Sequence, residues 1–473
     1  MEKQDIRKVL SVLPSVDYVM RLPETEQLID RYSRQLTTEA VREALNELRE
    51  AIKTGQNDSN VVTNKAELTV VVVQRAEQKL TALFAPSLRK VINATGVILH
   101  TNLGRAPLPE VARQNLARVT DGYANLEIDL PEGVRGERLS HVDELLCRLT
   151  GAEMSAVVNN NAAAVLLSLN TLALGKEVIV SRGQLIEIGG SFRLPEVMQR
   201  SGAIMVEVGT TNKTRASDYE AAITENTGAI LVAHTSNYRV LGFTEEAELE
   251  EVAEIAHRHG LPLIHDLGGG ILLDFRRFGL PHEPIVQESL SAGADVVTFS
   301  GDKVLGGPQS GIIVGKAKYL RRIRKNPLMR ALRCDKMVFA ALEPTLKLFL
   351  NEERLLQEHP TFRMLTEPVE AVQRRAEAFL ALIADLEAVA ADVVESFGQA
   401  GSGTLPLEKI PSRAVRLRHK QLPAAELATR LRAAEPPVIP YVREEAVYLD
   451  FRTVREDEVE ELVRVVRGAV TNG

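Results

Sequence analysis

The chain has 473 residues, of which 45% are hydrophobic and 26% are charged, so we expect a globular protein of about two or three domains. Its net charge of −7 argues against nucleic-acid binding over the whole surface, and its two cysteines exclude a disulfide framework, which favours the cytoplasm. The N-terminal stretch is too polar for a signal peptide, and the longest apolar run, residues 162–174, is shorter than the roughly 20 residues that span a bilayer, so no membrane segment is expected.

Three regions follow one another along the chain. Residues 1–85 are predicted to form helices only, because their apolar residues recur at spacings of three and four. In residues 86–344, short β-branched runs alternate with helical stretches, which predicts a mostly parallel sheet covered by helices on both faces. Residues 345–473 combine long helices with two strands, at 414–419 and 446–451, which indicates a smaller α+β domain. Ligands of parallel sheets bind beyond the carboxyl ends of the strands, so candidate site residues are sought there.

A polar turn of Asn159, Asn160 and Asn161 joins the run SAVVN to an alanine-rich helix. Backbone N–H groups and the helix dipole favour an anion at such a helix start, so this turn is a candidate phosphate cradle. Capping of the helix by asparagine is the other interpretation of the same residues. Further along the chain, Ser236 lies in the polar segment 234–237 after the run AILVA, where it is a candidate to bond the ring oxygen of a cofactor.

Two residues in the second region suggest pyridoxal 5′-phosphate (PLP). Lys303 follows the run DVVTFS, after Ser300 and Asp302, and a lysine desolvated at the end of a buried strand is available to form a Schiff base. Asp266 ends an earlier run before three glycines, and a carboxylate that pairs with the PLP ring nitrogen keeps the ring protonated. Each residue taken alone has a simpler interpretation: Lys303 as a surface lysine in a loop, and Asp266 as a helix cap or turn residue. The order phosphate cradle, ring acid, lysine is typical of PLP enzymes of fold type I, the aspartate aminotransferase type.

Residues 316–336 form the most basic segment, with nine lysines and arginines against one acid. A patch of this density can bind an anion, although a solvated helix face is an equally simple interpretation. Arg330 and Arg333 are three residues apart and therefore share a helix face. Arg105 lies elsewhere, in a glycine-containing turn after the run VINATGVIL.

Long stretches of the chain resemble bacterial selenocysteine synthase, the L-seryl-tRNA(Sec) selenium transferase family. These stretches are INATGVILHTNLGRAPL (92–108), VNNNAAAVLL (158–167), SRGQLIEIGGSFRLPEVM (181–198), DLGGG (266–270), SGDKVLGGPQSGIIVG (300–315) and NPLMRALRCDK (326–336). The likeness covers nearly the whole chain. It implies conversion of seryl-tRNA(Sec) to selenocysteinyl-tRNA(Sec) with selenophosphate, through an aminoacrylyl-tRNA intermediate.

The resemblance also implies roles for individual residues. Lys303 would carry PLP with Asp302 beside it, and a pocket for selenophosphate would be lined by Arg105, Arg330 and Arg333. Arginine matches such an anion bidentately, and the substrate carboxylate is esterified to the tRNA, so these arginines are free to bind it. The helical N-terminus would hold the D-arm region of tRNA(Sec). The family forms a ring of dimers, commonly a decamer, with sites at dimer interfaces.

Two other functions remain compatible with these residues. A PLP-dependent lyase or transferase acting on a small amino acid or amino sugar would use Lys303 and Asp266, but it gives no role to residues 1–85 or to the arginines. A non-catalytic protein of the PLP fold that only binds tRNA is the second alternative, and the intact Lys303 and Asp266 argue against it. Visible absorbance of bound PLP would separate the second from the others, and a tRNA(Sec) gel shift would separate the first.

Overall fold

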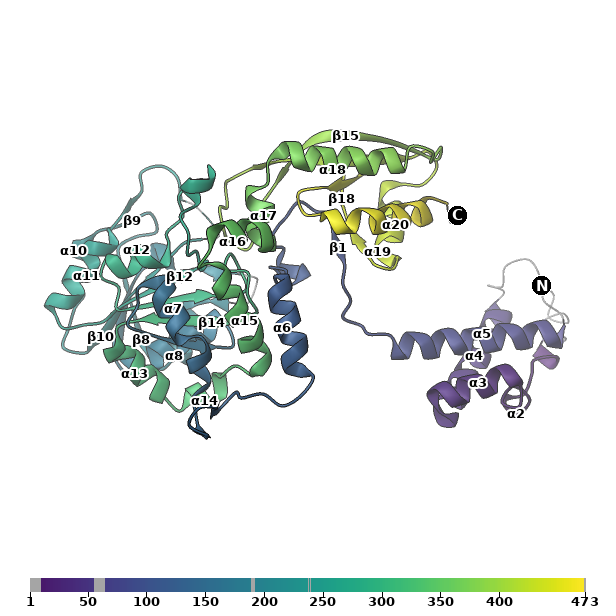
Figure 1. The fold of residues 1–473 in the computed structure, drawn as a ribbon, viewed down its shortest axis with the longest axis horizontal. Coiled ribbons are helices and arrows are strands. Elements are labelled where there is room, and N and C mark those ends of the chain that lie inside the picture. Colours follow the sequence, from purple (N-terminus) through teal and green to yellow (C-terminus); the bar gives the residue numbers. More distant parts are fainter. Residues whose placement is uncertain (1–9, 55–63, 189–191, 237, 239, 472–473) are drawn as a thin grey trace. The chain divides into compact units, whose positions relative to one another are not determined.

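The computed structural model describes residues 10–54, 64–188, 192–236, 238 and 240–471. The chain folds into two compact units, Met1–Lys90 and Val91–Gly473, each of which has its own core (Figure 1). Within the described residues, no helix is both long and apolar enough to cross a membrane.

The described part of the first unit consists of helices, as predicted: α2 (Val16–Val19), α3 (Pro23–Tyr32), α4 (Arg34–Thr54) and α5 (Lys65–Phe84). Each of the longer helices has one apolar face, and these faces pack together. Leu45 and Leu48 of α4 lie in one core with Val72 and Ala76 of α5. The side chain of Asn64 caps α5 by accepting a hydrogen bond from the backbone N–H of Ala66.

The second unit is built on a seven-stranded sheet. In spatial order its strands are β4 (Met154–Val158), β14 (Gly311–Gly315), β13 (Val296–Ser300), β12 (Leu263–Gly268), β10 (Thr227–Ala233), β5 (Glu177–Ser181) and β8 (Ile204–Val208). The strands pair in parallel except β14, which is antiparallel to both of its neighbours. Strands buried on both faces read as continuous apolar runs, which is why the sequence predicts this mostly parallel sheet.

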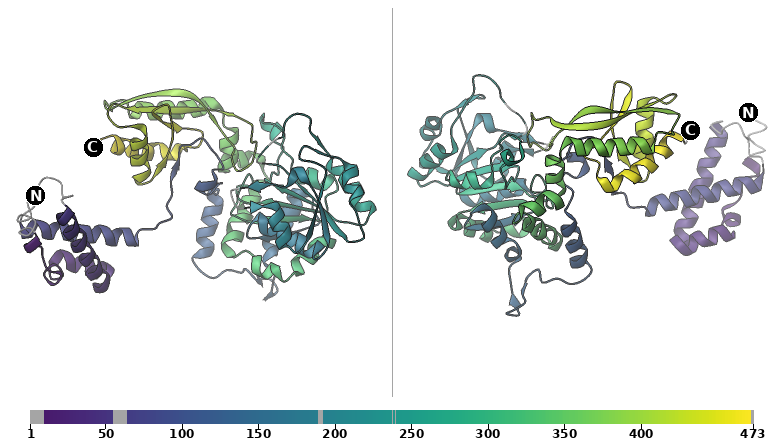
Figure 2. Two further views of the ribbon diagram at one scale, coloured as in Figure 1. Left: turned by 180° about the vertical axis from the view of Figure 1, so that it is seen from behind. Right: turned by 45° about the horizontal axis from the view of Figure 1, so that its top comes forward.

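Helices cover both faces of the sheet (Figures 1 and 2). On one face, α8 (Asn161–Ala173) packs against β13 and β14, and its first residue bonds Asp266. On the other face, α12 (Val286–Ser291) contacts His265 through Ser289. Neighbouring residues of a strand point to opposite faces, so α8 and α12 lie on opposite sides of β12. Around them lie α6 (Glu110–Thr120), α7 (Asp143–Thr150), α9 (Leu194–Arg200), α10 (Ala216–Ala221), α11 (Leu249–Arg258), α13 (Ala317–Lys325), α14 (Leu328–Leu332), α15 (Lys336–Leu348), α16 (Glu352–Glu358) and α17 (Pro360–Thr366).

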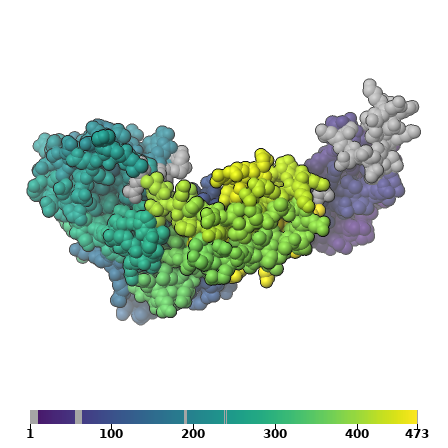
Figure 3. Space-filling view, turned by 90° about the horizontal axis from the view of Figure 1, so that it is seen from above, coloured from purple at the N-terminus to yellow at the C-terminus, as the bar shows by residue number. Residues whose placement is uncertain are grey.

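The C-terminal part of this unit, coloured green to yellow in Figure 3, has a four-stranded antiparallel sheet. Its order is β15 (Val389–Gly398), β16 (Ile410–His419), β19 (Ala446–Asp450) and β18 (Tyr441–Arg443). Helices α18 (Val369–Leu382) and α19 (Ala424–Ala433) pack on it, and α20 (Val459–Thr471) packs against both of them in the same core. Their apolar core is separate from that of the large sheet. Division of the chain at residues 85 and 344 stays a prediction.

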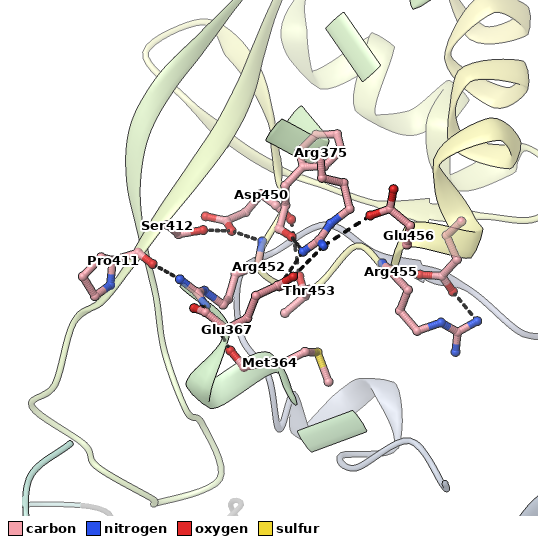
Figure 4. Close-up of polar contacts among 12 residues, drawn as sticks. Met364, Glu367, Arg375, Pro411, Ser412, Asp450, Arg452, Thr453, Arg455 and Glu456 are labelled. Atoms are coloured by element: carbon pink, nitrogen blue, oxygen red, sulfur yellow. Dashed lines mark hydrogen bonds and ion pairs between the residues drawn. The ribbon is translucent and has the colours of Figure 1, made fainter. Parts of the chain in front are cut away.

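A buried network of charged groups joins the C-terminal sheet to α17 (Figure 4). Arg375 forms two hydrogen bonds with the Glu367 carboxylate, at 2.8 and 2.7 Å. Arg452 donates to the backbone carbonyls of Glu367 and Pro411. Arg375 is buried, and its other carboxylate partner, Glu456 at 3.6 Å, is exposed to solvent, so removal of the Glu367 carboxylate would leave a weakly compensated buried charge, at a cost of about 3 kcal/mol. The network therefore fixes the C-terminal sheet against the helices beside the large sheet.

Candidate active site

The carboxyl ends of β10, β12 and β13 meet the N-terminus of α8 at a cavity of about 320 Å³. Parallel strands end at the same edge, so residues far apart in the sequence gather here. The cavity is lined by eight of the predicted site residues: Arg105, Asn160, Asn161, Ser236, Asp266, Ser300, Asp302 and Lys303. Ile186, Phe192, His234 and Gln309 also line it. Asn237, the last residue of the polar segment after β10, lies outside the described residues.

Asp266 is fixed on the floor of this cavity. It is 3% exposed, and its Oδ1 accepts hydrogen bonds from Asn161 Nδ2 at 2.8 Å and from Thr298 Oγ1 at 2.9 Å. Burial raises the pKa of Asp266, and the two hydrogen bonds and the nearby Lys303 act in the opposite direction. The carboxyl group therefore has a fixed orientation and gains from any cation placed beside it.

The asparagine turn has more than one role. Asn160 caps α8 by accepting from the N–H of Ala163 at 2.8 Å, which is the capping interpretation of the sequence. Asn161 donates to Asp266, and its own Oδ1 is buried with no hydrogen-bond partner among the described residues. Asn159 does not line the cavity, and its N–H bonds Leu332 O. The first N–H groups of α8 have no acceptor within the helix, so an anion can still bind at its N-terminus.

Lys303 begins the turn that follows β13. It is 5% exposed, and burial lowers the pKa of its amine, while Asp266 and Asp302 act in the opposite direction. Gly268, with φ +70°, lies across from it, and a Cβ at this position would come within 3.9 Å of Lys303 Nζ. A desolvated amine beside an open stretch of backbone is suited to Schiff-base chemistry.

Arg105 lines this cavity beside Lys303. Its Nη1 donates to Asp302 Oδ2 at 2.6 Å, which fixes the guanidinium next to Lys303. Its Nε is buried and has no hydrogen-bond partner among the described residues. The arginine is therefore held in place with donor capacity to spare, as an anion site requires.

Arg330 and Arg333 do not line the Lys303 cavity. Both line a second cavity of about 630 Å³, together with Arg135 and Arg138. Arg333 pairs with Glu127 at 3.4 Å. Within one chain, the three arginines expected to bind selenophosphate are therefore divided between two cavities.

Sequence reasoning missed His359, which lies between α16 and α17. It is completely buried, and its Nε2 lies 2.9 Å from the carbonyl oxygen of Leu305, in the turn that begins at Lys303. In the sequence, a histidine directly before Pro360 is explained by capping of a helix. No sequence pattern relates residue 359 to residue 305.

Two family models match the chain: L-seryl-tRNA selenium transferase over residues 91–455 and selenocysteine synthase N terminal over residues 10–49. The chain is 47% identical over 462 residues to L-seryl-tRNA(Sec) selenium transferase of Carboxydothermus hydrogenoformans, covering 98% of each chain. It is 47% identical over 461 residues to the same-named protein of Alkaliphilus metalliredigens, covering 97% of this chain and 98% of that one.

Among solved structures, D-glucosaminate-6-phosphate ammonia-lyase aligns with a TM-score of 0.56 at 22% identity, over 81% of this chain and 96% of that one. This similarity shows a shared fold. The fold is type I of the PLP-dependent enzymes, as the sequence predicts. By sequence, the chain belongs to the L-seryl-tRNA selenium transferase family.

Proposed function

We propose that this chain converts seryl-tRNA(Sec) to selenocysteinyl-tRNA(Sec), with selenophosphate as selenium donor and PLP as cofactor. The observation that carries the proposal is a buried lysine, Lys303, in one cavity with the doubly hydrogen-bonded Asp266, in a member of this family. A lyase acting on a small substrate would use the same two residues. The names of the 47% identical relatives and the N-terminal family match favour the tRNA reaction.

The residues of the cavity fit PLP. Lys303 would hold it covalently, Asp266 would pair with its ring nitrogen, and the N-terminus of α8 would bind its phosphate. Ser236 and Ser300 line the same cavity as further hydrogen-bonding groups. The unpartnered Asn161 Oδ1 and the raised pKa of Asp266 both point to a group that would complete this site. When bound, PLP supplies an electron sink for the α-carbon of the substrate.

The protein's own groups would carry the proton transfers and the anion binding. The lowered pKa of Lys303 favours a neutral amine, which is the form that removes the α-proton of the seryl group. Asp302 orients Arg105, whose remaining N–H groups would donate to an oxygen of selenophosphate. The cavity would thus hold the reacting carbon and the selenium donor side by side.

Arg330 and Arg333 would bind selenophosphate only if a second copy of the chain brings them to Lys303. This requirement agrees with the predicted ring of dimers, a decamer, with sites at dimer interfaces. The test mixes two inactive variants, Lys303→Ala and the double variant Arg330→Ala/Arg333→Ala, under conditions that exchange subunits. A shared site predicts roughly a quarter of wild-type activity, because half of the dimers are hybrids and one site in each is intact. No recovery in exchanged dimers would contradict a shared site.

The RNA part of the proposal has two supports. The helical first unit, matched by the N-terminal family model, would hold the D-arm region of tRNA(Sec). On α13, Tyr319, Leu320 and Ile323 are buried, while Arg321 and Lys325 are exposed and form no ion pair with any described residue. Exposed cations on one helix face would attract the phosphate backbone near the second cavity.

The decisive comparison for this function is between substrates. Holoenzyme is given seryl-tRNA(Sec), free serine or a small amino sugar acid, and the visible absorbance of bound PLP is followed. The proposal predicts a spectral change with seryl-tRNA(Sec) only. A change with free serine or the amino sugar acid, and none with the charged tRNA, would support the lyase alternative instead.

A further inference from the structure

His359 connects the helices beside the large sheet to the turn that contains Lys303. The turn is closed by a hydrogen bond from Gly306 N to Lys303 O at 2.9 Å, and by one from Gly307 N to Gly301 O at 2.8 Å. Leu305 lies in this turn and is fully buried, and its carbonyl oxygen lies 2.9 Å from His359 Nε2.

The two hydrogen bonds of His359 determine its tautomer. A carbonyl oxygen only accepts, so Nε2 carries the proton and donates to Leu305 O. Nδ1 then has a lone pair, which accepts from the backbone N–H of Phe362 at 3.3 Å and caps α17. Burial lowers the pKa of His359 to about 4, so the ring stays neutral near pH 7 and keeps this pattern.

The imidazole ring is also held by its packing. Phe349 and Phe362 contact it edge to face, with ring centroids 5.7 and 5.2 Å away. Gly306 lies against it with φ +68°, and a Cβ at that position would be 2.1 Å from His359 Cε1. Only glycine fits between the ring and the turn, so the position of the ring and the path of the backbone after Lys303 depend on each other.

From this geometry we propose that His359 is a positioning residue for Lys303: by donating to Leu305 O it holds the turn that directs the lysine amine into the cavity. The inference rests on the proposed role of Lys303 as the PLP-bearing residue. His359 itself touches neither substrate nor cofactor, since it does not line the cavity.

Two substitutions separate the two hydrogen bonds. His359→Asn keeps an oxygen that can cap α17, since asparagine is a good cap, but its side chain is too short to reach Leu305. His359→Gln has an amide that reaches Leu305 O, but it caps α17 poorly. Each variant loses one buried hydrogen bond, so a purely structural role predicts similar effects on all properties of the protein.

The measurements are the thermal midpoint of the holoenzyme, the pH midpoint of the visible PLP absorbance, and kcat with KM. The proposal predicts similar losses of thermal midpoint in both variants. Only the Asn variant is expected to shift the pH midpoint, by about half a unit or more, and to lose kcat by on the order of tenfold at unchanged KM. A wild-type pH midpoint in His359→Asn, or an equal shift in His359→Gln, would overturn the inference.

If His359→Asn does not fold, Phe349→Leu takes its place, because it loosens the ring but keeps both hydrogen-bonding atoms. Faster hydrogen exchange in residues 303–310, together with a smaller shift of the pH midpoint in the same direction, is expected. Faster exchange with an unchanged midpoint contradicts the inference. Failure of the proposed function would look different: wild-type protein would then show no PLP absorbance that depends on Lys303.

Discussion

Replacement of Asp266 by asparagine tests whether this carboxylate keeps the PLP ring nitrogen protonated. The substitution is nearly isosteric, and the position of its oxygen is already decided by the structure. Asn161 Nδ2 and Thr298 Oγ1 both donate to Oδ1 of Asp266, so the amide oxygen of the variant must take that place. The amide NH₂ group then faces the position proposed for the PLP ring nitrogen. A donor there stabilises an unprotonated ring, which is a weak electron sink.

The expected loss follows from this reversal. An ion pair between a buried carboxylate and a ring cation is replaced by a neutral hydrogen bond, so roughly 3 kcal/mol or more of transition-state stabilisation is lost, or on the order of 10²-fold in kcat. PLP should remain bound, because Lys303 and the N-terminus of α8 are unchanged. The assay measures kcat with seryl-tRNA(Sec) and selenophosphate, alongside the PLP absorbance and the thermal midpoint.

Asn161→Ala is the matched control for this experiment. It removes one of the two donors to Asp266 and leaves the carboxylate, so it should cost about 1–2 kcal/mol, and kcat should fall by roughly five- to thirtyfold. Near-normal turnover of Asp266→Asn, with a normal thermal midpoint, would show that the Asp266 charge does not contribute to the reaction and that Asp266 is a structural residue.

Four further outcomes are expected. Lys303→Ala should abolish borohydride-stable attachment of PLP and nearly all turnover; a label on another lysine in wild-type protein contradicts the assignment. Arg105→Ala should raise the selenophosphate concentration needed for half-maximal rate by about tenfold, because one charged hydrogen bond is lost, and it should not prevent loss of the seryl hydroxyl. Deletion of residues 1–90 should leave a PLP-binding protein with weakened tRNA(Sec) affinity, measured by filter binding. Changing Arg321 and Lys325 to glutamine should lower the slope of log affinity against log salt by about 1.5, and an unchanged slope would place the RNA elsewhere.

The strands, and the site residues that follow them, were predictable from the sequence because both depend on local sequence patterns. Buried strands appear as short β-branched runs, and the rule that ligands bind at strand ends directs attention to Asp266 and Lys303. The same rule explains why Ser236 and Ser300 line the cavity. A helix start after a strand is also visible in the sequence, so the N-terminus of α8 was recognisable as a candidate anion site.

What could not be predicted depends on long-range contacts. The sequence does not show that Asn161 bonds Asp266. An asparagine that caps a helix and one that bonds a residue of another strand have the same sequence pattern, and only the pairing of the strands separates them. Arg330 and Arg333 share a basic segment, but their distance from Lys303 depends on how α14 packs and on how copies of the chain assemble. His359 contacts a single carbonyl that lies 54 positions away in the sequence.

The proposed reaction replaces the seryl hydroxyl of a charged tRNA with selenium. The most direct measurement incubates purified holoenzyme with seryl-tRNA(Sec) and selenophosphate, hydrolyses the ester bond and identifies the released amino acid by mass spectrometry. We expect selenocysteine in the wild-type reaction and unchanged serine with Lys303→Ala. Unchanged serine from a wild-type holoenzyme that binds both substrates would contradict it.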